Sequence, residues 1–485
     1  MSDAPNTQRT SSASAAPTTR QRTRVPKRIA TVIINSLKGG VVPRIGLPYI
    51  TVGREPEINA LLRDLDIVAD GGASFRFVVG RYGSGKSFLL QTIRNHAMGK
   101  GFVVADADLS PERRLQGSKG QGLATYRELI GNLATKTRPE GGALTLILDR
   151  WISGVQAQVA AAGVLPDDPR FADEVERRIY AVIADLQEMV HGFDFAKILS
   201  TYFHAHLEAD DDTKASVLKW FRGEYRTKSE ARQELGVNVI IGDEDWYDYI
   251  KLFARFLRGA GYQGLVVLVD ELVNLYKIPN AISRQYNYEK ILTMYNDTLQ
   301  GKAQYLGIIM SGTPQCVEDR RRGLYSYEAL RSRLTQGRFG REGHVDLMAP
   351  VIRLTPLTPE ELLVLVEKLA NIHAGLFGYE RRVTEDDLAH FLEVELSRVG
   401  ADTHVTPREI IRDFIEMLDV MLQDPSQTVS SLLGSGDFGG LGSDSDGGSG
   451  AAGSAEGAPA MARVSSIGGA STTGADPAGY AEFKL

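Results

Sequence analysis

The sequence predicts an α/β protein in which a parallel sheet carries a helical insertion and is followed by a C-terminal helical lid. Three observations lead to this fold class. Short apolar runs alternate with helical patterns, which is typical of parallel strands covered on both faces. A glycine-rich loop stands between one such run and a helical stretch. After about Pro356 only helical patterns remain.

The N-terminal segment is rich in Ser, Thr and Ala and ends in a basic run from Arg20 to Arg28. Such a composition cannot bury enough apolar surface to offset the entropy lost on ordering. Residues 1–28 are therefore expected to form a disordered basic arm. This arm is either a solubilising tail or a segment that contacts phosphate groups.

The α/β domain is expected over residues 29–354, beginning with a short helix at Ile29–Leu37 that Gly39 and Gly40 stop. Its strands are expected at Ser74–Val79, Phe102–Ala105, Leu265–Val269 and Tyr305–Met310. The stretch from about 137 to 242 is too long for a loop and has helical patterning, so it is interpreted as a helical insertion.

The lid is expected over residues 355–425, where three amphipathic helices each follow a Thr that can act as an N-cap. They are expected at Glu360–Ala374, Thr384–Arg398 and Thr406–Leu422. Residues 426–485 are rich in Gly, Ser and Ala, and this composition predicts a disordered tail.

The composition of the 485 residues, with 43% hydrophobic and 24% charged side chains, excludes a wholly disordered, collagen-like or coiled-coil chain. No apolar run is long enough for a membrane span, and the N-terminus lacks the apolar core of a signal peptide. The single cysteine, Cys316, fits a cytoplasmic location. With a net charge of −6, nucleic-acid binding would need a local basic patch.

The segment Gly80–Ser87 matches the phosphate-loop pattern G-x-x-x-x-G-K-[ST], with a predicted strand before it and a helix after it. Its backbone N–H groups are expected to cradle phosphate oxygens of ATP, Lys86 to reach the β- and γ-phosphates, and Ser87 to bind Mg²⁺. The predicted nucleotide-binding residues here are Gly80, Arg81, Tyr82, Gly83, Ser84, Gly85, Lys86, Ser87 and Phe88.

The apolar run Leu265–Val269 leads directly into Asp270 and Glu271. At the carboxyl edge of a parallel sheet, Asp270 is expected to hold Mg²⁺ and Glu271 to polarise the attacking water. An acidic pair that caps a helix is the alternative interpretation. After the next strand, Ser311 and Thr313 are both candidates for a side chain that senses the γ-phosphate, and an ordinary turn is the alternative.

Two arginines complete the predicted site. Arg333 is expected to stabilise charge on the γ-phosphate, either within the chain or from a neighbouring subunit, although a solvated basic face is also possible for this arginine-rich stretch. Arg408 opens a lid helix, where a cation is mildly unfavourable, and it is expected to fold onto the nucleotide.

Taken together, these motifs resemble those of the AAA+ ATPases, in particular the origin-recognition/initiator-like branch, over about Val52–Leu422 apart from the insertion. Thr51-Val-Gly-Arg54-Glu55-Pro-Glu57-Ile resembles the entry motif that lies over the adenine, which implies that Arg54 binds nucleotide. Ser332-Arg333-Leu resembles the arginine-finger box, and Arg408 the second sensor arginine.

A narrower resemblance is to the bacterial BrxD-type ATP-binding proteins of phage-defence and stress-response gene clusters. It is carried by Arg81–Leu90, Val104–Arg113 and Gly122–Leu129. The resemblance implies a cytoplasmic ATPase that works beside a superfamily II helicase on DNA. The insertion departs from the minimal AAA+ core, and no winged-helix module follows the lid.

The favoured hypothesis is an oligomeric, Mg²⁺-dependent ATPase that remodels, loads or regulates a DNA-processing partner. DNA contact through the basic arm or the insertion is a further expectation. The alternative is a slow nucleotide-dependent switch with the same site residues. A GTPase is disfavoured because no guanine-reading Asn/Thr-Lys-x-Asp motif follows the strand that carries Asp270.

Overall fold

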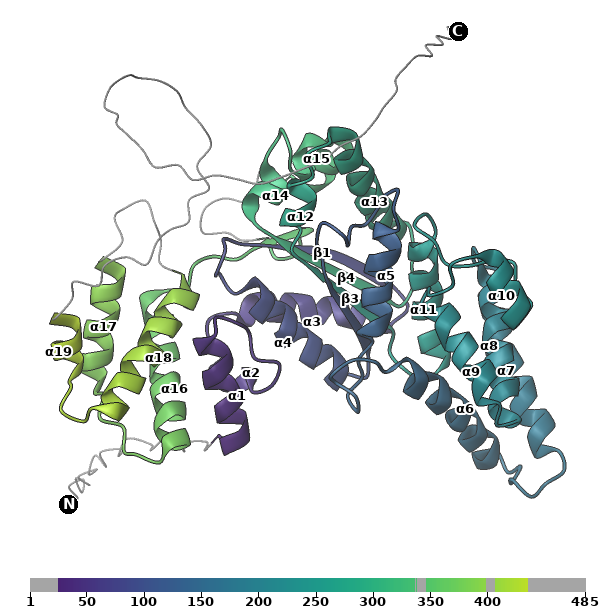
Figure 1. Cartoon of the computed structure of the whole chain (residues 1–485), viewed down its shortest axis with the longest axis horizontal. Helices are drawn as coiled ribbons and strands as arrows, with labels where there is room; N and C mark the ends of the chain where they lie inside the picture. Colours follow the sequence, from purple (N-terminus) through teal and green to yellow (C-terminus); the bar gives the residue numbers. More distant parts are fainter. Residues whose placement is uncertain (1–24, 336, 338–345, 398–405, 435–485) are drawn as a thin grey trace, which may run out of the picture. The chain divides into compact units, whose positions relative to one another are not determined.

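The computed structural model describes residues 25–335, 337, 346–397 and 406–434 (Figure 1). Its five strands form one fully parallel sheet in the order β2-β3-β4-β1-β5. The strands are β1 (Ala73–Val79), β2 (Val103–Asp108), β3 (Leu265–Asp270), β4 (Leu306–Gly312) and β5 (Val351–Arg353). The four strands expected from the sequence are therefore present in an α/β fold, as predicted.

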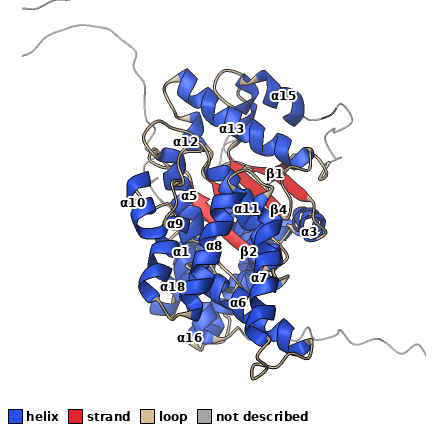
Figure 2. Cartoon of the chain, turned by 90° about the vertical axis from the view of Figure 1, so that its right-hand side faces the viewer, coloured by secondary structure: helices blue, strands red, loops and turns tan. Residues whose placement is uncertain are grey.

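The strands are mostly apolar because both faces of the sheet are covered by helices (Figure 2). In β3, Leu265, Val267 and Val269 join one hydrophobic core, whereas Val266 and Leu268 join the other. The second core contains α3 (Glu55–Ala69) and α4 (Lys86–Gly99), and the first contains α5 (Gln121–Gly131), α11 (Trp246–Gly259) and α13 (Ala281–Leu299).

The insertion between β2 and β3 is helical, as the sequence predicts. Its helices are α6 (Leu144–Ala161), α7 (Phe171–Gln187), α8 (Gly192–Leu207), α9 (Asp211–Phe221) and α10 (Lys228–Leu235). They share the larger hydrophobic core with the sheet, so the insertion is packed onto the α/β domain. Trp220 and Trp246 are buried there, and their indole N–H groups donate to backbone carbonyls of Val239 and Leu115.

The lid consists of α16 (Pro359–Phe377), α17 (Glu385–Ser397), α18 (Pro407–Gln423) and α19 (Val429–Gly434). The first and third follow Thr358 and Thr406, which form capping boxes with Glu361 and Glu409. The short helix α19 falls inside the stretch expected to be a disordered tail, and its Val429 is buried in the lid core. Residues 435–485 of that tail lie outside the described residues.

The N-terminal helices α1 (Lys27–Lys38) and α2 (Leu47–Ile50) pack on the lid, not on the sheet. Ala30, Ile33 and Ile34 of α1 lie in the same hydrophobic core as the lid helices. Lys38 also donates to Asp419 of α18, with Nζ and Oδ2 2.6 Å apart. Residues 1–24 of the expected basic arm lie outside the described residues.

The remaining helices lie between β3 and β5. They are α12 (Val273–Tyr276), α14 (Pro314–Glu318), the 3₁₀ turn η1 (Leu324–Ser326) and α15 (Glu328–Leu334). Among the helices that the structure describes, none is both long and apolar enough to cross a bilayer.

Candidate nucleotide site

The phosphate loop connects the carboxyl end of β1 to the first turn of α4, the position predicted from its motif. The Gly80 N–H donates to the Gly312 carbonyl of β4, which fixes the start of the loop to the sheet. Gly83 has a φ of 76°, and a Cβ atom there would lie 2.6 Å from the Thr406 side chain. Glycine is therefore needed both for the turn and for the close approach of the lid.

Lys86 and Ser87 are the first two residues of α4, so the loop ends where free backbone N–H groups and the helix dipole favour an anion. The Lys86 Nζ donates to the Arg81 carbonyl at 3.0 Å, which keeps the ammonium folded over the loop. Burial lowers the pKa of the Lys86 ammonium, and the nearby carboxylates of Asp270 and Glu271 oppose this shift.

Asp270 ends β3 and is held by three donors. The Ser87 hydroxyl donates to its Oδ2 at 2.7 Å, the Glu271 N–H donates to its Oδ1 at 2.8 Å, and the buried Ser311 hydroxyl donates to the same Oδ1. The Ser87 hydroxyl and the Asp270 carboxylate are hard oxygen donors of the kind that Mg²⁺ prefers. Among the described residues, no group of three or more His, Cys, Asp or Glu side chains is placed to hold a metal ion by itself.

Glu271 follows Asp270 with a φ of 63°, in the left-handed region that non-glycine residues seldom adopt. This strain turns the chain sharply at the edge of the sheet, and Glu271 lines the cavity together with Lys86 and Ser87. Strained backbone of this kind is concentrated at functional sites. The side chain is exposed to the cavity and therefore accessible to a water molecule.

Asp108 is a carboxylate of the site that the sequence analysis missed. It ends β2 directly opposite Asp270 in the parallel register and lines the same cleft as Asp270 and Glu271. Desolvation raises the pKa of the Asp108 carboxyl, and repulsion from Asp270, Asp106 and Glu271 raises it further. Asp106 on the same cleft is paired with the buried Arg94 of α4.

We expect Asp108→Asn to raise the thermal unfolding midpoint at pH 7, without nucleotide, by about 2 °C. A raised pKa means that the folded chain holds this proton more tightly than the unfolded chain, so ionisation at higher pH costs stability. The gain should vanish near pH 4 and below, where the carboxyl is protonated in the folded state, and the comparison of the two pH values is the internal control. A lower midpoint at pH 7 would mean that the Asp108 carboxylate makes a stabilising contact.

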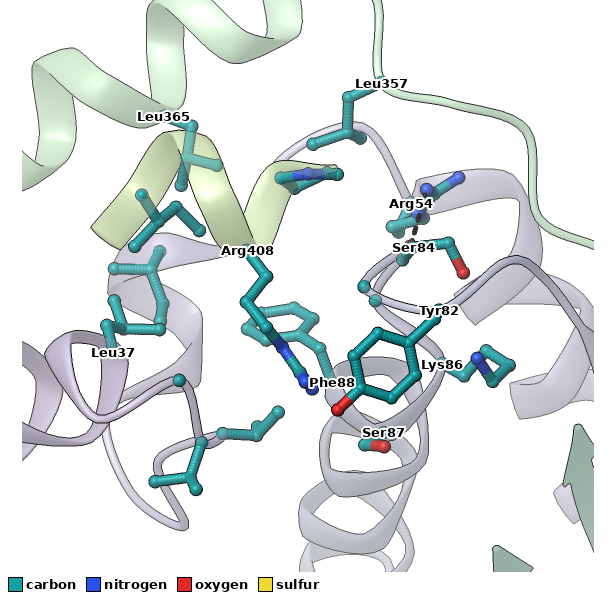
Figure 3. Close-up of a pocket in the computed structure, with 18 of the residues that line it drawn as sticks. Leu37, Arg54, Tyr82, Ser84, Lys86, Ser87, Phe88, Leu357, Leu365 and Arg408 are labelled. Atoms are coloured by element: carbon teal, nitrogen blue, oxygen red, sulfur yellow. Dashed lines mark hydrogen bonds between the residues drawn. The ribbon is translucent and has the colours of Figure 1, made fainter. Parts of the chain in front are cut away.

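A cavity with an apolar and a polar side lies between the phosphate loop and the lid (Figure 3). The apolar side suits a nucleobase. It is formed by Leu37, Val41, Val42, Ile50, Val52, Phe88, Leu357, Leu365 and Ile411. The polar side presents the phosphate loop, and an adjoining cleft continues to Asp270.

Arg408 reaches this cavity from the first turn of α18. Its guanidinium lies over the ring of Tyr82 in the phosphate loop, 4.7 Å from the ring centroid (Figure 3). Tyr82 is 68% exposed, so its ring is open to solvent beside this contact. The lid arginine and the phosphate loop are therefore brought together, as the sequence analysis expects of a nucleotide-contacting arginine.

Arg54 lines the cavity, but its guanidinium is engaged with the protein itself. Nη2 donates to the Ser84 carbonyl at 3.3 Å and to the Thr355 carbonyl at 2.8 Å, and Nη1 contacts the Glu57 carboxylate at 3.3 Å. Whether Arg54 also binds nucleotide stays a prediction.

Five of the predicted site residues that the structure describes line neither the cavity nor the adjoining cleft, and they are Gly80, Arg81, Ser311, Thr313 and Arg333. Thr313 is the N-cap residue of α14, and its hydroxyl lies 3.1 Å from the Cys316 sulfur. Arg333 is exposed on α15, with Nη1 donating to the Ala329 carbonyl. Of the two sensor candidates, the structure brings Ser311 to Asp270. Arg333 lies on the surface, outside both parts of the cavity.

The missed residues had recognisable signals. Asp106 and Asp108 stand at the end of an apolar run, the same pattern that drew attention to Asp270. The sequence analysis assigns Gly39 and Gly40 only the role of a helix stop, yet they directly precede the cavity-lining Val41 and Val42.

The chain matches a protein-family model over most of its length. The family model described as BREX system ATP-binding protein BrxC/D matches residues 25–437. The chain belongs to this family. The match includes the phosphate loop, Asp270 and Glu271, the insertion and the lid.

Membership makes the chain an ATP-binding protein of the BREX phage-defence system, in agreement with the BrxD-type resemblance. Comparison with curated proteins finds no match. The family is ATP-binding, and the phosphate loop of this chain lines the cavity described above.

Proposed function

We propose that this protein hydrolyses ATP with Mg²⁺ and uses the cycle to act on a partner that processes DNA during phage defence. The observation that carries the proposal is the arrangement around Asp270, which is bonded to Ser87 and Ser311 and is followed by the strained, accessible Glu271. A site that only bound ATP would need the phosphate loop but not a second carboxylate facing the γ-phosphate position.

Each residue of the site has a separate role in the proposed hydrolysis of ATP. Lys86 and the loop N–H groups hold the phosphates, while Ser87 and Asp270 supply the oxygen ligands for Mg²⁺, which neutralises phosphate charge when bound. Glu271 accepts a proton from the attacking water. Ser311 orients Asp270 from the neighbouring strand, which supports it over Thr313 as the residue that couples β4 to the site.

The partners are also part of the proposal. The exposed position of Arg333 outside the cavity supports a homo-oligomer in which this arginine reaches the site of a neighbouring chain. A superfamily II helicase is the partner that the BrxD-type resemblance implies, in the bacterial cytoplasm. For DNA contact the basic arm is favoured over the insertion, since residues 144–235 contain 16 Asp and Glu against 11 Lys and Arg.

The second candidate function is a slow nucleotide-dependent switch. It is favoured by the direct contact of the lid with the phosphate loop, where Arg408 lies over Tyr82 and Thr406 packs against Gly83. These contacts would let the position of the lid depend on whether the phosphate loop holds ATP or ADP, even if ATP hydrolysis is slow.

The experiment that separates the two functions is a measurement of ATP turnover by the purified chain, alone and with single- or double-stranded DNA. Turnover that rises with DNA supports the ATPase and places DNA on this chain. Slow turnover that is indifferent to DNA, with ATP-dependent assembly, supports the switch.

We expect Lys86→Ala to weaken ATP binding by roughly 10- to 100-fold, because charge-assisted bonds to the phosphates are lost. Titration of a fluorescent ATP analogue measures the affinity. Lys302→Ala, at an exposed lysine that the cavity does not include, is the matched control and should bind as the parent does. Unchanged affinity in Lys86→Ala would show that the phosphate loop is not the binding site.

A further inference from the structure

Arg54 connects three separate parts of the chain through one buried guanidinium. Only 5% of the residue is exposed, and its Nη2 donates to the Ser84 carbonyl in the phosphate loop (Figure 3). The same Nη2 donates to the Thr355 carbonyl. Its third partner, Glu57 on α3, is 7% exposed and supplies the compensating negative charge. The side chain is therefore fixed in place by the α/β domain.

Thr355 belongs to the connection between β5 and α16, which is the link from the sheet to the lid. On the strand side of this connection, the Leu354 N–H donates to the Val79 carbonyl of β1. On the lid side, Thr358 caps α16. Thr355 is thus positioned between a segment bonded to the sheet and a segment that belongs to the lid.

The residues before Arg54 are attached to the lid as well. The Lys368 Nζ of α16 donates to the Thr51 carbonyl at 2.7 Å. Gly53 has a φ of 65°, and a Cβ atom there would lie 2.4 Å from the Glu361 carboxyl group. The segment from Thr51 to Arg54 therefore has α16 on one side, whereas only Arg54 reaches across to the phosphate loop.

We propose that Arg54 is a positioning residue that couples the phosphate loop to the lid hinge, and through the hinge sets where Arg408 lies over the nucleotide. One Nη2 group serves both carbonyls, so a shift of Ser84 around bound phosphates changes the bond to Thr355. The planar fork of arginine can bond Glu57 and both carbonyls at once, which a lysine cannot do. The proposal rests on the proposed function only in requiring that ATP bind at this loop.

The test follows the distance between the α/β domain and the lid in the full chain. Spin labels at Gln300 and Glu393, both exposed, report this distance by pulsed electron resonance in a background where the buried Cys316 is replaced by alanine. Each variant is measured without nucleotide and with a non-hydrolysable ATP analogue and Mg²⁺, and analogue affinity and kcat are measured alongside.

In the parent we expect the analogue to shift or narrow the distance distribution. Arg54→Lys should bind the analogue within about 5-fold of the parent but lose this response, with kcat at least about 10-fold lower. Glu57→Gln keeps the Arg54 guanidinium but gives it a neutral partner, and it should lose part of the response of the distance to the analogue. This second variant keeps the proposal testable if Arg54→Lys fails to fold. Lys368→Met removes a lid contact that does not reach the loop, and it should keep the response.

Three outcomes would overturn the proposal. The first is an unchanged response in both Arg54→Lys and Glu57→Gln. The second is a loss of affinity in Arg54→Lys as large as that in Lys86→Ala, which would make Arg54 a nucleotide ligand. The third is an equal loss of response in Lys368→Met, which would assign the effect to general lid attachment. A parent chain that fails to bind the analogue would instead contradict the proposed function.

Discussion

Glu271→Gln is expected to bind ATP as tightly as the parent and to hydrolyse it about 10²–10⁴-fold more slowly. The substitution keeps the size of the side chain and the φ of 63° at this position, so the cavity and the phosphate loop are preserved. What is lost is the carboxylate that accepts the proton of the attacking water. The variant should therefore accumulate as an ATP-bound complex.

Single-turnover hydrolysis of radiolabelled ATP, with binding measured in parallel, checks this expectation. Glu393→Gln, an exposed carboxylate on α17, is the matched control and should hydrolyse at the parental rate. If Glu271→Gln keeps that rate as well, the proton acceptor is another group, and Asp108 becomes the first carboxylate to test because it faces the same cleft.

Arg333→Ala should lower turnover by about 10³-fold or more while ATP binding is kept, the effect typical of removing an arginine that acts on the γ-phosphate from outside. Arg333 is exposed on α15 and does not line the cavity of its own chain. Arg331→Ala is the matched control, since Arg331 lies on the same helix and pairs with Glu328. That variant should turn over ATP at nearly the parental rate.

Mixing Arg333→Ala with Lys86→Ala tests whether the arginine comes from a neighbour. Each variant alone is inactive, but in a mixed head-to-tail assembly about a quarter of the sites would combine an intact Lys86 with an intact neighbouring Arg333. Activity should therefore reappear on mixing, and it should depend on protein concentration. No recovery at any ratio would exclude a shared site.

The sheet and the phosphate loop could be predicted because their signals are local. An apolar run such as Leu265–Val269 needs two covered faces, and the loop motif has its strand and helix beside it in the sequence. Asp270 was found for the same reason. Asp108 also follows an apolar run, but its place beside Asp270 depends on β2 lying next to β3, which the run by itself does not show.

Other features depend on geometry that residue spacing does not give. Ser311 and Thr313 are two residues apart and would share a face of a continuing strand, but β4 ends at Gly312, so only Ser311 is directed by the strand. The apolar spacing of α1 predicted a helix with a buried face, yet the partner of that face is the lid. The packing of α19 on the lid was not predicted, because the sequence around this short helix is rich in Gly and Ser.

The attachment of α1 to the lid decides what the N-terminal end of the chain can transmit. Because the basic segment preceding Lys27 is joined covalently to α1, its point of anchorage is the lid and not the sheet. If ATP moves the lid, as the proposed function requires, a partner bound to that segment would move with it, and the bond between Lys38 and Asp419 would help to hold α1 on the lid. The lid, which contacts the phosphate loop, and the segment that binds the partner would then belong to the same part of the protein.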